Sequence, residues 1–121
     1  MTASNQAPAR FRALVTSSPD MRRRDPVDRA LTALRRKHPG LVVVHLDASE
    51  GDRIADSWAR MMGVEVDVQA PADDLEPRDL PAFINGVLDL GVDGVVALGG
   101  GDDMVVFIAR QRGVAVWEVG G

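Results

Sequence analysis

The stretch VVALGGGDDMV, residues 95–105, decides how this chain folds. Its first four residues form an apolar run that predicts a buried strand, three glycines follow, and Asp102 has the position of a helix N-cap. Glycines let the backbone approach a ligand closely, and the free N–H groups at a helix start attract anions. A strand, a glycine turn and a helix in this order are typical of proteins that hold a nucleotide phosphate. Asp102 and Asp103 argue against that use, because two carboxylates in the first helical turn would repel a phosphate.

The same order of strand and helix extends to both sides of this stretch. Apolar runs predict strands at residues 11–16, 41–46, 94–98 and 114–119, and the alternation of valine and acid at 64–68 predicts a less buried or edge strand. Apolar residues at spacings of three and four predict helices at 25–38, 49–62, 81–90 and 102–112, the first with Asp25 as N-cap and Pro26 at the first position. The alternation predicts an α/β, Rossmann-like three-layer fold with a five-stranded parallel sheet of order 3-2-1-4-5.

Length and composition exclude several classes of protein. With 121 residues, 45% of them hydrophobic, we expect a flexible N-terminal tail at 1–9 and a single domain at 10–121. A net charge of −4 and 4% aromatic residues argue against binding of duplex nucleic acid, and the absence of cysteine excludes a disulfide framework. No apolar run is long enough for a membrane span and no signal peptide is visible, so we expect a cytoplasmic protein. Lys37 is the single lysine, and this composition suggests a GC-rich actinobacterial or phage genome.

Parallel sheets of this order bind ligands beyond the carboxyl ends of their strands, where the strand order reverses. We therefore expect the site between residues 16–20 and 99–103, bordered by 47–52. Asn85 is included because Asn is not favoured in mid-helix, and Asp20 serves equally well as a turn residue. No catalytic and no metal-ligating residue is predicted. The candidate binding residues are Thr16, Ser17, Ser18, Asp20, Asp47, Ser49, Asp52, Asn85, Gly99, Gly100, Gly101, Asp102 and Asp103.

Structural roles compete with ligand binding at several of these positions. The three glycines suit a tight turn that needs positive φ. Asp102 suits an N-cap, the alternatives being recognition of ribose hydroxyls or of a hydrated Mg²⁺. Asp52 has the spacing of a capping partner for Ser49. His45, at the end of a buried strand, is expected to be a structural histidine with satisfied hydrogen bonds rather than a catalytic one.

The loops also resemble a known family. The segments VTSSPDM (15–21), HLDASEGD (45–52), GGGDDM (99–104) and VAVWEV (114–119) match the motifs VTGSRDW, HGGAxGAD, GGxGTxDM and VPVWEV. By these motifs the chain resembles the SLOG superfamily in its YspA-like branch, which is related to the LOG phosphoribohydrolases and the DprA DNA-processing proteins. The resemblance covers about residues 11–119 and implies a Rossmann-like fold and a nucleotide-derived ligand.

The chain departs from the family pattern at the ligand loops. Six family glycines or arginines are replaced, and a Gly-Thr pair is missing from the last loop. Loss of two arginines removes bidentate phosphate donors. The replacing residues include Ser17, Pro19, Leu46, Asp47, Glu50 and Ile84.

Three functions are consistent with these observations. The first is a non-catalytic protein that binds a nucleotide or an ADP-ribose-like ligand, with no cofactor assigned. The second is an enzyme similar to the phosphoribohydrolases that acts on nucleoside monophosphates. The third is an oligomeric, partner-binding protein with a vestigial cleft. Since SLOG relatives commonly dimerise through helices beside the site, the resemblance also implies a homodimer or higher homo-oligomer.

Overall fold

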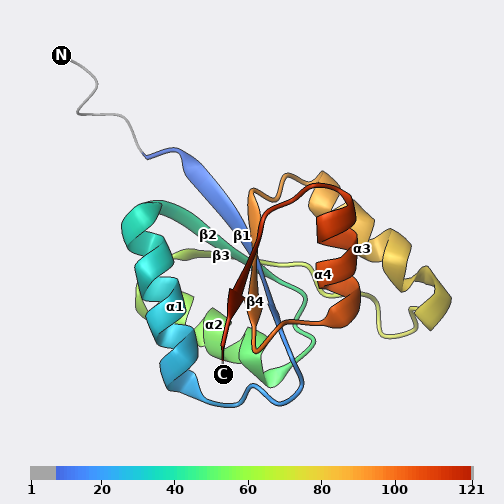
Figure 1. The fold of residues 1–121 in the computed structure, drawn as a ribbon, viewed down its shortest axis with the longest axis horizontal. Coiled ribbons are helices and arrows are strands. Elements are labelled where there is room, and N and C mark those ends of the chain that lie inside the picture. The colour runs from blue at the N-terminus through green and yellow to red at the C-terminus, as the bar shows by residue number, and fades with distance from the viewer. Residues whose placement is uncertain (1–7, 121) are drawn as a thin grey trace.

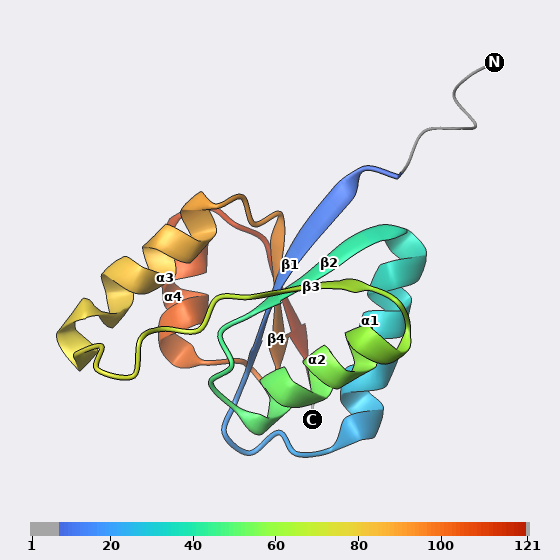
Figure 2. The same ribbon diagram turned by 180° about the vertical axis from the view of Figure 1, so that it is seen from behind.

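A parallel sheet divides the molecule into two helical layers (Figures 1 and 2). The computed structural model describes residues 8–120. Residues 1–7 of the predicted tail therefore lie outside the described residues. The strand order is β3-β2-β1-β4-β5, as the sequence predicts. The strands are β1 (Arg10–Ser17), β2 (Gly40–His45), β3 (Glu65–Val68), β4 (Gly94–Leu98) and β5 (Val116–Val119).

Two helices cover each face of the sheet. Figure 1 shows α1 (Arg24–Lys37) and α2 (Glu50–Met61) on the left of the sheet, with α3 (Leu80–Asp89) and α4 (Asp103–Gln111) on the right. A single turn of 3₁₀ helix, η2 (Pro77–Asp79), precedes α3. Among the described residues no helix is long and apolar enough to cross a membrane.

The central strand β1 supplies both hydrophobic cores. Ala13 and Val15 pack on the α1–α2 side, while Leu14 packs on the α3–α4 side, and all three are fully buried. Successive side chains of a strand point to opposite faces. A strand covered on both faces therefore needs the continuous apolar run that the sequence shows.

The N-cap of the first helix lies two residues earlier than predicted. Arg23 is the N-cap of α1 and makes no capping hydrogen bond through its side chain, whereas Asp25 lies inside the first turn. The prediction of Asp25 as N-cap is therefore wrong. Pro26 is tolerated at its position because the first turn of a helix has N–H groups without intrahelical acceptors.

Candidate functional site

A pocket of about 460 Å³ opens at the carboxyl ends of β1 and β2. The end of β1 forms its floor, the β2–α2 loop forms one wall, and the starts of α3 and α4 form the other. Its polar lining includes Thr16, Ser17, Arg22, Ser49, Glu50, Asp52, Arg53 and Asp102, and its apolar lining includes Pro19, Leu46, Ala48, Pro71, Leu80, Ile84 and Val105.

Five of the candidate binding residues meet around this pocket: Thr16, Ser17, Ser49, Asp52 and Asp102. They come from three segments that are far apart in the sequence. The residue before Asp52, Gly51, allows the start of α2 to approach β1 closely. A Cβ on Gly51 would lie only 2.1 Å from the Oγ atom of Ser17.

Asp52 is the buried acid of the pocket. Its Oδ2 atom accepts a hydrogen bond of 2.9 Å from the N–H of Ala48, and its own N–H donates to the Oγ atom of Ser49 at 3.2 Å. Half of the predicted capping box is thus present, because the carboxylate reaches Ala48 instead of returning to Ser49. The Oδ1 atom is buried and has no partner among the described residues. Burial raises the pKa of Asp52, and the hydrogen bond from the N–H of Ala48 opposes that rise.

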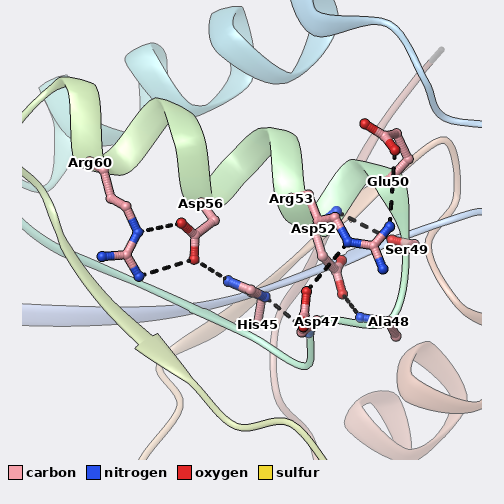
Figure 3. A network of polar contacts seen from close by, with 9 residues as sticks. All are labelled: His45, Asp47, Ala48, Ser49, Glu50, Asp52, Arg53, Asp56 and Arg60. Carbon is pink, nitrogen blue, oxygen red and sulfur yellow. Dashed lines mark hydrogen bonds and ion pairs between the residues drawn. The ribbon is translucent and has the colours of Figure 1, made fainter.

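His45 holds the β2–α2 loop in place (Figure 3). Its side chain is 2% exposed, its Nδ1 atom accepts from the N–H of Asp47 at 3.0 Å, and its Nε2 atom lies 2.7 Å from Oδ2 of Asp56. Because Nδ1 accepts, the ring proton belongs on Nε2, where it is donated to Asp56. Arg60 and, next, His45 lower the pKa of Asp56. Both ring nitrogens are thus engaged in holding the fold together.

Two arginines that line the pocket, Arg22 and Arg53, are absent from the candidate residues of the sequence analysis. Arg53 makes only long ion pairs, at 3.6 Å to Asp47 and 4.0 Å to Glu50 (Figure 3). Arg22 also lines the pocket and makes no ion pair or side-chain hydrogen bond within residues 8–120. The position of Arg53 in the first turn of α2 is a sequence signal that could have placed it here, whereas the placement of Arg22 depends on how its loop packs.

The glycine turn after β4 satisfies its own backbone donors. The N–H of Gly99 donates to Val119 O at 2.7 Å and that of Gly101 donates to Leu98 O at 3.1 Å. The N–H of Asp102 donates to Oγ1 of Thr16 at 3.1 Å. All three glycines have positive φ, between 61° and 92°. The turn therefore needs glycine for its conformation, and most of its N–H groups are closed to an anion.

Asp102 closes the start of α4 in the same way. Its Oδ1 atom accepts hydrogen bonds from two N–H groups of the first helical turn, those of Met104 at 3.0 Å and Val105 at 3.2 Å. This is the N-cap role that competed with ligand recognition in the sequence analysis. The carboxylate occupies donors that a phosphate would otherwise use.

The crevice expected between the first and fourth loops is filled by their own contacts. The N–H of Ser18 donates to Leu98 O at 3.0 Å, and a Cβ on Gly99 would lie 2.7 Å from Oγ of Ser18. The direct gap between the two loops is therefore closed at Ser18 and Gly99, although Thr16, Ser17 and Asp102 of the same loops line the pocket. The pocket lies beside this contact, toward the loop that follows β2.

Comparison with known families agrees with this architecture. A model of the YAcAr family, the YspA, cpYpsA-related SLOG family, matches residues 11–74 of the 121. The chain belongs to this SLOG family. No curated protein matches this chain. The matched segment of the SLOG domain runs from β1 through β3, and it contains the end of β1 and the β2–α2 loop that line the pocket.

Asn85 of the SLOG domain does not reach the pocket. Its Nδ2 atom donates to Pro81 O at 2.9 Å and its Oδ1 atom accepts from Arg112 at 3.0 Å, so it joins α3 to the end of α4. The prediction that Asn85 points into the cleft is wrong. An internal hydrogen bond to the carbonyl four residues earlier satisfies the amide in mid-helix. Its neighbour Ile84 lines the pocket instead.

The other candidate residues of the SLOG domain lie outside the pocket lining. Asp20 is exposed in a turn that the Met21 N–H closes onto Ser18 O at 3.1 Å. Asp47, with φ of 54°, lines a separate small hollow together with His45. The residues that do not line the pocket are Ser18, Asp20, Asp47, Asn85, Gly99, Gly100, Gly101 and Asp103.

Proposed function

We propose that this SLOG-family protein binds a nucleotide-derived small molecule in the pocket at the ends of β1 and β2. One observation carries the proposal: the pocket brings together Arg22, which has no ion pair among residues 8–120, and the buried carboxyl of Asp52, one oxygen of which has no partner among the same residues. A cation, a carboxyl group and an apolar wall are complementary to the phosphate, the sugar hydroxyls and the base of a nucleotide.

The phosphate is assigned to arginine side chains, because the glycine turn has few free donors. Arg22 and Arg53 both line the pocket, and the two ion pairs of Arg53 are long enough to be exchanged for a phosphate. A guanidinium binds phosphate with two parallel hydrogen bonds. Arg22 and Arg53 therefore supply the charge that the N-terminus of α4, capped by Asp102, does not offer.

The sugar and base are assigned to the interior of the pocket. Asp52 and Ser49 lie on the β2–α2 wall, where carboxyl and hydroxyl oxygens accept hydrogen bonds from ribose. Leu46, Leu80 and Ile84 provide apolar surface for a base. Burial favours the neutral form of Asp52, which reduces the repulsion between its carboxyl group and a phosphate.

The hydrogen bonds of the pocket hydroxyls support binding over catalysis. Ser17 donates to Ser18 O, and the oxygens of Ser49 and Thr16 accept from backbone N–H groups. Each hydroxyl therefore has a structural role in place of an adjacent general base. One observation favours the second candidate, a phosphoribohydrolase-like enzyme: a buried carboxyl with a raised pKa, such as Asp52, is suited to protonate a leaving base.

A thermal-shift screen tests the proposal. AMP, ADP, ATP, ADP-ribose, NAD, cyclic nucleotides and adenosine would each be added to the wild type and to Arg22→Gln. A ligand at one hundred times its Kd stabilises the fold by about 2.7 kcal/mol, which raises Tm by several degrees. We expect Arg22→Gln to lose about tenfold in affinity for phosphate-bearing ligands while adenosine binding stays unchanged.

Arg23→Gln is the matched control, because Arg23 is exposed in the same loop and does not line the pocket. An equal loss in Arg22→Gln and Arg23→Gln would contradict the assigned phosphate contact. A flat response to the whole panel would contradict the proposed function. Chromatographic detection of free adenine after incubation with AMP, abolished in Asp52→Asn, would establish the enzyme instead.

A further inference from the structure

The two edges of the sheet differ in chemistry. Strand β3 carries Glu65 and Asp67, which form ion pairs with Arg10 and Arg12 of β1. Charged side chains of this kind protect an edge strand from pairing with another chain. The other edge, β5, reads VWEV and carries one charged side chain, Glu118, with no lysine, proline or glycine between Val116 and Val119. Edge β5 is therefore the less protected of the two.

Hydrogen bonds to β4 show which backbone groups of β5 are free. Val95 N–H donates to Ala115 O at 2.9 Å and Gly99 N–H donates to Val119 O at 2.7 Å. Since alternate residues of a strand bond to the same neighbour, Trp117 also directs its backbone groups toward β4. Val116 and Glu118 consequently point their N–H and C=O groups away from the sheet.

Large apolar side chains lie on both sides of this edge. Trp117 is 43% exposed and lines a hollow of about 510 Å³ between α1 and β4–β5. On the opposite face, Phe107 of α4 is 60% exposed and lines a second hollow together with Glu118. Figure 1 shows β5 in dark red with α1 and α4 on its two sides. An edge with free backbone groups and two exposed aromatic side chains has the composition of an interface.

We propose that β5 pairs antiparallel with β5 of a second copy of this chain, about a two-fold axis at Trp117. This register opposes Val116 to Glu118 of the partner subunit, so that the free N–H and C=O groups of both residues are satisfied. Trp117 then faces Trp117 of the partner subunit as a non-hydrogen-bonded pair, whose side chains come closest.

Charge favours a second copy as the occupant. Glu118 forms an ion pair with Arg110 of α4. The register places each ion pair opposite the apolar Val116 of the partner subunit instead of opposite another bare charge. Strand β5 is thus complementary to itself, and the two sheets join into one continuous sheet. This inference does not depend on the proposed ligand, because none of the β5 residues lines the pocket.

Molar mass in solution tests the pairing. Light scattering after size exclusion, over a wide range of protein concentrations, is expected to give twice the 13.0 kDa of the chain. Glu118→Pro removes an outward N–H without removing a bond to β4, and we expect a monomer. Glu118→Ala removes the same ion pair but keeps the N–H, and is expected to remain dimeric.

Val68→Pro is the control for proline in an edge strand. Gln69 N–H donates to His45 O, so the N–H of Val68 on β3 points away from the sheet. This variant is expected to remain dimeric. Circular dichroism and Tm would establish that each proline variant is folded. A wild type of 13.0 kDa at every concentration would overturn the proposal.

A cysteine trap tests the register even if a proline variant fails to fold. The chain contains no cysteine. Mild oxidation of Trp117→Cys is expected to give a disulfide-linked dimer, because non-hydrogen-bonded pairs place two Cβ atoms within about 4.5–5.5 Å. Val119→Cys lies opposite residue 115 of the partner subunit and is expected to stay unlinked. Equal cross-linking of the two variants, or none in Trp117→Cys, would overturn the pairing.

Discussion

Asp52 makes the stability of the fold depend on pH. Burial raises its pKa above the ordinary value of 3.8, so the folded protein favours the neutral carboxyl more than the unfolded chain does. The stability that this group contributes is complete below pH 3.8 and is lost as the pH rises through the raised pKa. Asp52→Asn removes the titration, so we expect the variant to gain stability relative to the wild type as the pH rises through this window. Urea unfolding of both proteins at a series of pH values measures this stability difference.

Asp56→Asn is the matched comparison, because the stability that Asp56 contributes depends on pH in the opposite direction. Arg60 and His45 lower the pKa of Asp56, so its contribution is present above 3.8 and is lost as the pH falls through the lowered pKa. The difference between Asp56→Asn and the wild type should therefore shrink toward acid pH. Stability differences that do not change with pH in either variant would contradict the two assignments.

Residue roles were predictable from sequence where they depend on near neighbours. The capping roles of Asp102 and Ser49 follow from residues two or three positions away, and both appear in the structure. Asn85 was misplaced because its partner Arg112 lies 27 residues away. The position of Arg22 at the pocket depends on how its loop packs, which no local spacing encodes.

At the scale of the element, two glycines of the turn before α4 separate the cost of a left-handed backbone from the cost of crowding by an added Cβ. Gly100 has φ of 92° and open space around a Cβ, whereas a Cβ on Gly101 would lie 2.8 Å from Thr16 and 2.9 Å from Ala97. Gly100→Ala is expected to cost about 1–2 kcal/mol from the left-handed backbone alone. Gly101→Ala should cost about 1–3 kcal/mol more, because it also overpacks the end of β1. Denaturant unfolding of the two variants gives both values, and equal losses would show that crowding contributes nothing.

The elements themselves were largely predictable, because their patterns are strong. Continuous apolar runs identified the buried strands, and three-to-four spacing identified all four α-helices. The start of α1 was misjudged because Asp25-Pro26 is a common opening pair, whereas the N-cap is Arg23, two residues before Asp25. The close contact between Ser18 and Gly99 was not predicted, because a contact between distant loops has no signature in either loop.

At the scale of the whole molecule, core residues on the two faces of the sheet differ in whether they also line the pocket. Leu31 lies in the core on the α1–α2 side, and Ile84 lies in the core on the α3–α4 side while also lining the pocket. Leu31→Ala and Ile84→Ala are each expected to lower the free energy of unfolding by about 2–5 kcal/mol. Only Ile84→Ala should also lower the affinity for the nucleotide that binds the wild type most tightly, and calorimetry measures this change in Kd. Equal changes in Kd in the two variants would contradict the location of the binding pocket.

The closed glycine turn has a consequence for the protein without ligand. Backbone N–H groups of such a turn commonly bind a phosphate. In this protein they donate hydrogen bonds to Val119, Leu98 and Thr16. The domain therefore completes its fold alone, and a ligand would meet a preorganised surface. Association should then cost little ordering entropy and bury little new backbone. The empty protein should resist proteases at this turn as well as the loaded one does, so its cellular lifetime would not depend on the supply of its ligand.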